Sequence, residues 1–163
     1  MSKATYTRDT EAKTLTVERD FDAPRNKVWG AFTKSEMLEK WIAPKPLEAH
    51  TVSSDFREGG HWHCYMVGPD GVKMYSRFDY ETIDAPKCYT GQDSFCDEAG
   101  KKDESMPSNH WDVKFTQNGD TTKLTIIMTF ASVDDLEKTV ASGFQESFSM
   151  GFENLDEILA EKK

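Results

Sequence analysis

The segment His61-Trp62-His63-Cys64 holds the residue types that most readily suggest chemistry, because histidine and cysteine are common zinc ligands. In an extended strand, side chains alternate between two faces, so His61 and His63 share one face while Trp62 and Cys64 share the other. Two histidines at this spacing could bind a metal ion, but no third ligand is suggested nearby in the sequence. We therefore expect both histidines on an exposed polar face, the apolar pair toward the core, and neither a metal nor a cofactor.

Nucleophilic and acid–base catalysis have weaker support in the sequence. There is no Gly-x-Ser-x-Gly nucleophile motif. Cys64, placed among large apolar side chains, is expected to have a raised pKa and to behave as a small hydrophobic residue. Asp79 and Glu81 alternate with Phe78 and Tyr80, so both carboxylates are expected to face water. We predict no catalytic residue; the alternative, a cyclase or hydrolase, would need a carboxylate, histidine or arginine that points into a cavity.

Aromatic residues are better candidates for a binding site, because they alternate onto the apolar faces of the expected strands and helices. The predicted lining of an internal cavity is Trp41, Trp62, Cys64, Phe78, Tyr80, Trp111, Phe144 and Phe148. The same residues could instead fill a solid core at native packing density, and the sequence leaves both interpretations open. In a pocket, the hydroxyl of Tyr80 and the indole N–H of Trp111 could orient a ligand, because such groups need partners when buried.

The longest periodic element lies near the C-terminus, from Ser132 to about Ala160. Apolar residues recur there with the period of an amphipathic helix, and Ser132 can serve as the N-cap. One helix of this length would span roughly 40 Å. Gly143, Ser147 and Gly151 form a second stripe beside the apolar one. This stripe predicts either close packing of another backbone, the more ordinary interpretation, or a notch beside an internal space.

The order of periodic segments predicts an α+β fold. A first strand near residues 15–21 precedes two short helices, one after Pro24 and one after Ser35, and Pro44 and Pro46 end the second of them. Six further alternating segments follow, separated by turn residues; they cover residues 47–55, 60–67, 73–83, 87–95, 109–117 and 121–130. We expect about seven strands in one curved antiparallel sheet, with the long C-terminal helix packed across its apolar face.

Composition and charge limit the classes of function. We expect a single domain over residues 1–163, with a core over about 12–160. The net charge of −9 argues against a nucleic-acid partner, which would need clustered lysine and arginine. No apolar run approaches the ~18 residues of a membrane span, and the first residues lack a signal-peptide pattern. The three cysteines form no Cys-x-x-Cys pair, which fits reduced thiols in the cytoplasm.

Several short motifs, in this order along the chain, resemble one known family. They are Phe21-Asp22-Ala23-Pro24-Arg25 with Val28-Trp29, Arg57-Glu58-Gly59-Gly60 before Trp62, Gly68-Pro69-Asp70-Gly71, Glu81-Thr82-Ile83-Asp84-Ala85-Pro86, and Gly143-Phe144 with Leu155-Asp156. Over about residues 12–160, the chain resembles the activator of heat-shock-protein-90 ATPase homologue-like group of the START/SRPBCC (Bet v 1-like, helix-grip) superfamily. Two departures, Ala85 for the usual proline and Cys88 for an aliphatic residue, leave the fold assignment intact.

The resemblance implies a curved antiparallel sheet that grips a long helix, with a cavity for hydrophobic small molecules between them. The leading hypothesis is therefore a cytoplasmic helix-grip protein that binds a small hydrophobic or amphipathic ligand without chemistry of its own. The family name also implies a chaperone-associated regulatory role as an alternative. We expect no counterpart of the separate N-terminal domain through which the founding co-chaperone engages its chaperone. A homodimer is a further open alternative.

Overall fold

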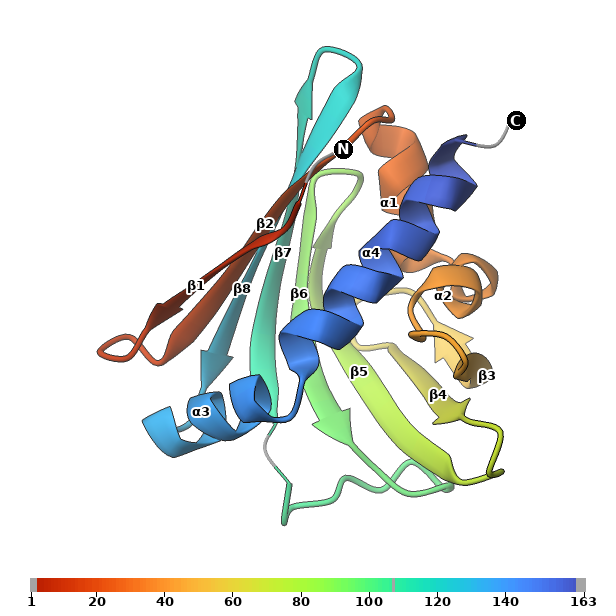
Figure 1. Cartoon of the computed structure of the whole chain (residues 1–163), viewed down its shortest axis with the longest axis vertical. Helices are drawn as coiled ribbons and strands as arrows, with labels where there is room; N and C mark the ends of the chain where they lie inside the picture. Colours follow the sequence, from red (N-terminus) through yellow and green to blue (C-terminus); the bar gives the residue numbers. More distant parts are fainter. Residues whose placement is uncertain (1–2, 107, 161–163) are drawn as a thin grey trace.

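The computed structural model describes residues 3–106 and 108–160, which form one antiparallel sheet with helices across one face (Figure 1). The strands are β1 (Thr5–Asp9), β2 (Thr14–Phe21), β3 (Glu48–Asp55), β4 (His61–Val67), β5 (Lys73–Asp84), β6 (Cys88–Phe95), β7 (Asn109–Asn118) and β8 (Thr121–Phe130). The helices are α1 (Arg25–Thr33), α2 (Ser35–Trp41), α3 (Val133–Ala141) and α4 (Phe144–Ala160). The strand order is β1-β2-β8-β7-β6-β5-β4-β3, and the predicted α+β helix-grip fold is confirmed.

Alternation of apolar and polar residues explains the strands. In β8, Leu124, Ile126 and Met128 are buried, whereas Ile127 between them is exposed. β7 and β8 pair along their whole length without a register shift, and Gly119 allows the tight turn between them with a φ of +67°. All six segments that the sequence predicted between residues 47 and 130 are strands in the structure.

The sheet has one strand more than the sequence predicted. β1 pairs with β2 along its whole length at the edge of the sheet. Its residues are almost all exposed, so it lacks the apolar alternation by which strands are recognised in a sequence. Tyr6 is half-buried, and its hydroxyl lies 2.9 Å from Ser149 Oγ and 3.2 Å from the carbonyl oxygen of Gln145 on α4. The strand is therefore held by its pairing with the neighbouring β2 and by the contact of Tyr6 with α4.

The C-terminal helix is shorter than predicted. Ser132 does cap a helix, because its side chain accepts a hydrogen bond of 3.1 Å from the backbone N–H of Asp135. That helix, α3, ends at Ala141, and α4 begins at Phe144. Gly143 lies between them with a φ of +91°, a left-handed conformation that favours glycine. The expectation of one unbroken helix is therefore wrong, and α4 with its 17 residues is roughly 25 Å long.

Gly151 marks a point where α4 closely approaches another segment of the backbone. A Cβ atom at this position would lie 3.1 Å from the carbonyl oxygen of Trp41 and 3.4 Å from that of Ile42. Nearby on the same helix, the side-chain amide of Asn154 donates hydrogen bonds of 3.3 Å to the carbonyl oxygens of Trp41 and Ala43. Close backbone packing, the more ordinary of the two interpretations of the glycine stripe, is therefore correct for Gly151.

A buried ion pair fixes α4 to the sheet. Arg19 on β2 donates two hydrogen bonds, of 2.8 and 2.5 Å, to the carboxylate of Asp156 on α4, and the Arg19 side chain is only 3% exposed. The guanidinium carbon also lies 4.7 Å from the ring centroid of Phe21 and 5.6 Å from that of Phe152. The C-terminal half of α4, which lies beside α1 and α2, is thus anchored on both sides (Figure 1).

Replacing Asp156 by asparagine should lower the free energy of unfolding by roughly 3 kcal/mol, because the buried Arg19 charge loses its carboxylate. Arg8 on β1 and Glu137 on α3 provide a matched control, since they form a similar strand–helix pair whose side chains are both half exposed. Glu137→Gln should cost less than about 1 kcal/mol. Urea unfolding followed by tryptophan fluorescence measures both values. Equal losses in the two variants would contradict a structural role for the buried pair.

Candidate functional site

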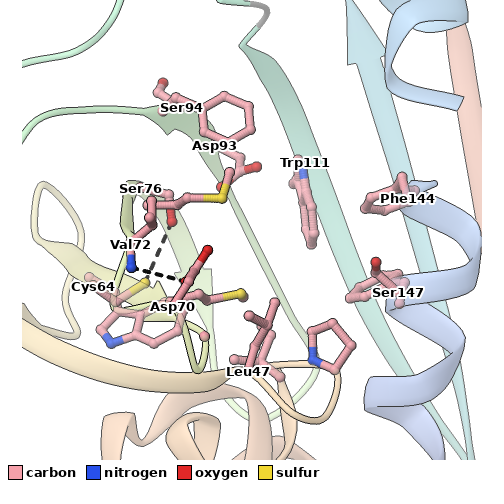
Figure 2. Close-up of a pocket in the computed structure, with 18 residues that line it drawn as sticks. Leu47, Cys64, Asp70, Val72, Ser76, Asp93, Ser94, Trp111, Phe144 and Ser147 are labelled. Carbon is pink, nitrogen blue, oxygen red and sulfur yellow. Dashed lines mark hydrogen bonds between the residues drawn. The ribbon is translucent and has the colours of Figure 1, made fainter. Parts of the chain in front are cut away.

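A cavity of about 490 Å³ lies between the inner face of the sheet and the N-terminal part of α4 (Figure 2). Its walls come from β4, β5, β6 and β7 on one side and from α4 on the other, and the segment after α2 contributes Ile42, Pro44 and Leu47. Val72 and Met74 also line the cavity, and both side chains are exposed. The cavity therefore opens to solvent beside the turn between β4 and β5.

The structure places all eight predicted lining residues at a cavity wall. Five of the eight line the 490 Å³ cavity, namely Trp62, Cys64, Trp111, Phe144 and Phe148. The remaining three, Trp41, Phe78 and Tyr80, are among the residues that line a smaller cavity of about 70 Å³ next to α1 and α2. Trp41 is also a core residue, because it is fully buried and its indole N–H donates a hydrogen bond of 2.9 Å to the carbonyl oxygen of Ala31. Contact between these residues and a ligand stays a prediction.

Aromatic contacts connect the sheet to α4 beside the cavity. The ring of Trp111 lies edge-on to Phe78 and to Phe148, with centroid distances of 5.7 and 5.8 Å. Phe148 in turn contacts Phe144 at a centroid distance of 5.0 Å. Each such ring pair contributes about 0.5–1.5 kcal/mol beyond the burial of its surface. The aromatic lining is therefore a connected layer that spans the sheet and the helix.

Most polar groups of the lining aromatic residues already have partners. The indole N–H of Trp111 donates to Asn109 Oδ1, and that of Trp62 donates to Thr51 Oγ1 at 3.0 Å. The role predicted for Trp111 in orienting a ligand would therefore require this hydrogen bond to break. The Tyr80 hydroxyl has no hydrogen-bond partner among the described residues, and burial raises its pKa, so that it keeps its proton. Of the two groups proposed to orient a ligand, Tyr80 is the one still available.

Cys64 has the environment that the sequence predicted. It is buried on β4, and its Sγ atom lies 3.5 Å from the hydroxyl oxygen of Ser76. Burial raises the pKa of the thiol to about 12. At neutral pH the thiol is therefore protonated and a poor nucleophile, and it serves as a small polarisable part of the cavity wall.

Asp93 is a candidate functional residue that the sequence analysis did not identify. It lies on β6 between Phe78 of β5 and Asn109 of β7, and it lines both cavities. Figure 2 shows it beside Trp111 on the sheet side, with Phe144 on the helix side. Its carboxyl group has no hydrogen-bond partner among the described residues, and burial raises its pKa to about 7. Asp93 is therefore a half-buried acid whose accessible surface faces the cavity.

The sequence of β6 does contain a signal for the orientation of Asp93. Tyr89, Gly91 and Asp93 share one face of the strand, and Tyr89 is buried. Gly91 interrupts this pattern, because a Cβ atom there would lie 2.3 Å from a ring carbon of Phe78. Because a glycine and an acid occupy two of these three positions, the inward face of β6 lacks the alternation of apolar residues by which an inward face is recognised in a sequence.

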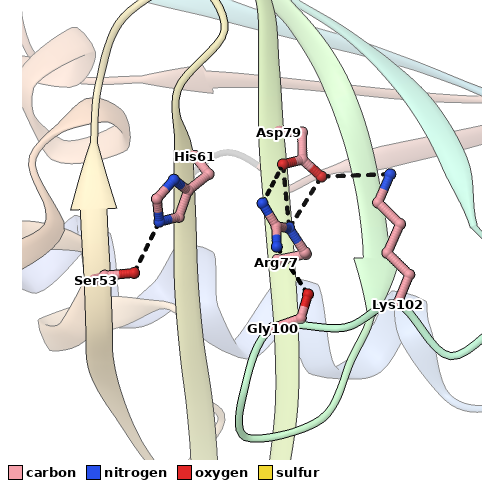
Figure 3. Close-up of polar contacts among 6 residues, drawn as sticks. All are labelled: Ser53, His61, Arg77, Asp79, Gly100 and Lys102. Carbon is pink, nitrogen blue, oxygen red and sulfur yellow. Dashed lines mark hydrogen bonds and ion pairs between the residues drawn. The ribbon is translucent and has the colours of Figure 1, made fainter.

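On β4, one of the two histidines predicted to be exposed differs from the prediction. His61 is partly accessible, and its Nε2 lies 2.8 Å from Ser53 Oγ (Figure 3). His63 is only 5% exposed, because the loop after β6 folds back over it and places the carbonyl oxygen of Asp97 3.2 Å from its Nε2. The expectation of two exposed histidines is therefore wrong for His63. No cluster of three or more histidine, cysteine or acidic residues in the described part of the chain could hold a metal ion.

The carboxylates on this outer face are held in ion pairs. Asp79 accepts hydrogen bonds of 2.7 and 3.1 Å from the guanidinium of Arg77, and Lys102 Nζ lies 3.5 Å from its carboxylate (Figure 3). Arg77 also donates a hydrogen bond of 2.7 Å to the carbonyl oxygen of Gly100. Neither Asp79 nor Glu81 lines either cavity. As the sequence predicted, neither is positioned to act as an acid or base inside them.

Comparison with known proteins identifies the family. Residues 22–160 match the family described as Activator of Hsp90 ATPase homolog 1-like protein. The chain belongs to this family. A protein from Arthrobacter aurescens is 31% identical, with a TM-score of 0.89 and coverage of 97% of this chain and 92% of that chain. A protein from Mycobacterium smegmatis is 28% identical, with a TM-score of 0.89 and coverage of 98% and 99%. No curated protein matches the chain.

Membership of the Activator of Hsp90 ATPase homolog 1-like family confirms the resemblance indicated by the sequence motifs. The solved structures confirm the helix-grip fold over almost the whole chain. In the described part of the chain, no helix is long and apolar enough to cross a membrane. None of these findings names a ligand, so the function has to be argued from the cavity itself.

Asp93→Asn should stabilise the protein near pH 8 and have little effect near pH 4. Folding raises the pKa of Asp93 from its ordinary value of 3.8 to about 7. Between these values the folded protein keeps a proton that the unfolded chain releases, so stability is lost as the pH rises through this window. The neutral asparagine removes the penalty and should add roughly 1–4 kcal/mol to the free energy of unfolding above the window. Urea unfolding at a series of pH values measures the effect.

Asp112→Asn is the control, because Asp112 is an exposed carboxylate on the neighbouring strand β7. Its free energy of unfolding relative to the wild type should stay the same across the pH range. A pH-independent effect of Asp93→Asn would contradict the raised pKa of Asp93, and a loss of stability near pH 8 would show that its carboxylate has a stabilising partner in the folded protein.

Proposed function

We propose that the protein binds a small hydrophobic or amphipathic molecule in the cavity between the sheet and α4. The observation that carries this proposal is the cavity of about 490 Å³, because small-molecule sites typically have volumes of about 300–1,000 Å³. Its walls are mainly apolar and aromatic, with few polar groups, among them Ser76 and Asp93. Apolar walls that carry a few placed polar groups are the usual composition of such sites.

Close packing elsewhere on α4 supports a binding site over a packing defect. Protein interiors contain few voids larger than a water molecule. Phe152 and Leu155 on the same helix are fully buried, and Gly151 lets the helix backbone approach the carbonyl oxygen of Trp41. The chain therefore achieves tight packing along one half of α4 and leaves space along the other half.

The rim of the cavity suits the entry of an apolar molecule. Val72, Met74 and Phe95 are large hydrophobic residues that line the cavity and are exposed. Exposed apolar surface that is contiguous with a pocket is a common feature of ligand-binding sites. A hydrophobic ligand would cover part of this surface on binding, and the burial of apolar area would favour the complex.

A cyclase or hydrolase activity is a second candidate function, and Asp93 is the observation that favours it. A carboxyl group with a pKa raised to about 7 can accept or donate a proton at neutral pH. Cys64 offers no second catalytic group beside it, because burial keeps its thiol protonated. Mass spectrometry of a bound ligand before and after incubation separates the two functions. Conversion that Asp93→Asn abolishes would establish catalysis, whereas an unchanged ligand would support binding alone.

A chaperone-associated regulatory role is an alternative that the family description alone suggests. An ATPase assay of the chaperone with and without the protein tests this alternative directly. A lack of stimulation would exclude the role, whereas stimulation by both the wild type and a cavity-filling variant would show that it is independent of the ligand site.

Filling the cavity without disturbing the core tests the proposed ligand site. Ser147 lies on α4, lines the cavity and is exposed, so Ser147→Trp introduces an indole while the packed residues stay unchanged. Binding of a neutral fluorescent probe, N-phenylnaphthylamine, should weaken roughly 10-fold or more, a change of about 1.4 kcal/mol or more in binding free energy. Fluorescence titration measures the dissociation constant.

Glu146→Trp is the matched control, because Glu146 is the preceding residue on the same helix, is exposed and does not line the cavity. This variant should bind the probe as the wild type does. The proposed site is wrong if the wild type fails to bind the probe, or if Ser147→Trp binds it as tightly as Glu146→Trp.

A further inference from the structure

The charges around the cavity have one sign. Among the described residues that line the 490 Å³ cavity, Asp70 and Asp93 are acidic and none is lysine, arginine or histidine. Arg77 borders the smaller cavity, but its guanidinium is bound on the outer face to Asp79 and to the carbonyl oxygen of Gly100. A ligand in the main cavity therefore meets apolar walls and negative charge.

Asp93 has no hydrogen-bond donor among the residues that the structure describes. Its register neighbours on the inner face are Phe78 and Asn109. Phe78 has no polar group, and the side-chain oxygen of Asn109 accepts the indole N–H of Trp111. No described residue donates a hydrogen bond to the Asp93 carboxyl, whose pKa is raised by burial alone. A carboxylate removed from water without a donor costs free energy, and a ligand that supplies a donor removes that cost.

The titratable groups around Asp93 add no charge of their own near neutral pH. Burial raises the pKa of Cys64 on β4 to about 12. Burial also raises the pKa of Tyr80 on β5, of Tyr89 on β6 and of Cys96 just after β6. The residues that α4 contributes to the main cavity carry rings or a hydroxyl and no charge. The Asp93 carboxylate is therefore the charge in the more buried part of the cavity, whereas Asp70, the other acidic lining residue, is exposed.

We propose that the ligand is a hydrophobic amine, bound with its ammonium group at Asp93 and its apolar part against the aromatic wall. This inference rests on the proposed function and specifies the ligand class of the same site. An ammonium group would donate a charge-assisted hydrogen bond to the carboxylate. Figure 2 shows Trp111 beside Asp93 at the cavity wall, and the face of an aromatic ring attracts a cation.

The same charges act against an anionic ligand. A fatty acid or another carboxylate bound at this depth would place a second negative charge near Asp93 in an apolar surrounding, which is unfavourable for both groups. The net charge of −9 also attracts cations to the protein from solution and repels anions. The selectivity between an amine and a carboxylate of the same shape is therefore the property to measure.

Three ligands with one carbon skeleton test the inference: phenylbutylamine, phenylbutanol and phenylbutyrate, which near pH 8 are a cation, a neutral alcohol and an anion. Isothermal titration calorimetry should rank their affinities for the wild type in that order, with the amine roughly 10-fold or more tighter than the alcohol. Asp93→Asn should lose the preference for the amine, so that the amine and the alcohol bind this variant within about twofold of each other. Ser147→Trp should weaken the binding of all three ligands, which would locate them in the cavity.

Asp70→Asn is the control for charge at the rim. Asp70 is exposed, and its Oδ1 accepts a hydrogen bond of 3.1 Å from the backbone N–H of Val72. This variant should keep the preference for the amine. If the alcohol binds but the amine binds no tighter, or if Asp93→Asn keeps the preference, the amine inference is wrong while the ligand site stands. If none of the three ligands binds, the proposed ligand site fails together with it.

Discussion

The close approach of α4 to the segment after α2 determines the shape of the inner face. At Gly151 the helix backbone meets the carbonyl oxygens of Trp41 and Ile42, and further along the same helix Asp156 binds the buried Arg19. Both contacts lie in the C-terminal half of α4. They anchor the helix at one end, and the space between its N-terminal half and strands β4 to β7 becomes the cavity. The space for the proposed ligand therefore depends on contacts made elsewhere on α4, in which the polar residues of the cavity take no part.

Asp93 is the feature of this cavity that packing alone does not explain. A carboxylate without a donor lowers stability on an otherwise apolar face, and a neutral residue of similar size would avoid this cost. Carboxyl groups with raised pKa values in clefts are concentrated at functional sites, because their environment suits them to bind a cation or to transfer a proton. The residue that lowers the stability of the fold is thus also the one that would make the proposed ligand site selective.

The sequence by itself determined the secondary structure from residue 47 to residue 130 and the family. The strands there follow from alternation, and the cap at Ser132 follows from a hydrogen bond to a backbone N–H three residues away. These are interactions between residues that are close along the chain. The motifs that resemble the family lie in similarly short segments, and the match over residues 22–160 confirms them. Alternation also assigned Trp62 and Trp111 to the inner face, where both line the cavity.

Only the tertiary structure decided where space remains and which polar groups surround it. The loop that covers His63 and the contact of Tyr6 on β1 with α4 both join segments that are remote in sequence. The environment of Asp93 also depends on remote segments, because its lack of a hydrogen-bond partner among the described residues is set by the strands on both sides of it and by the helix opposite. An aromatic residue fills a core or borders a cavity according to the distance between two layers, and no local pattern of residues specifies that distance.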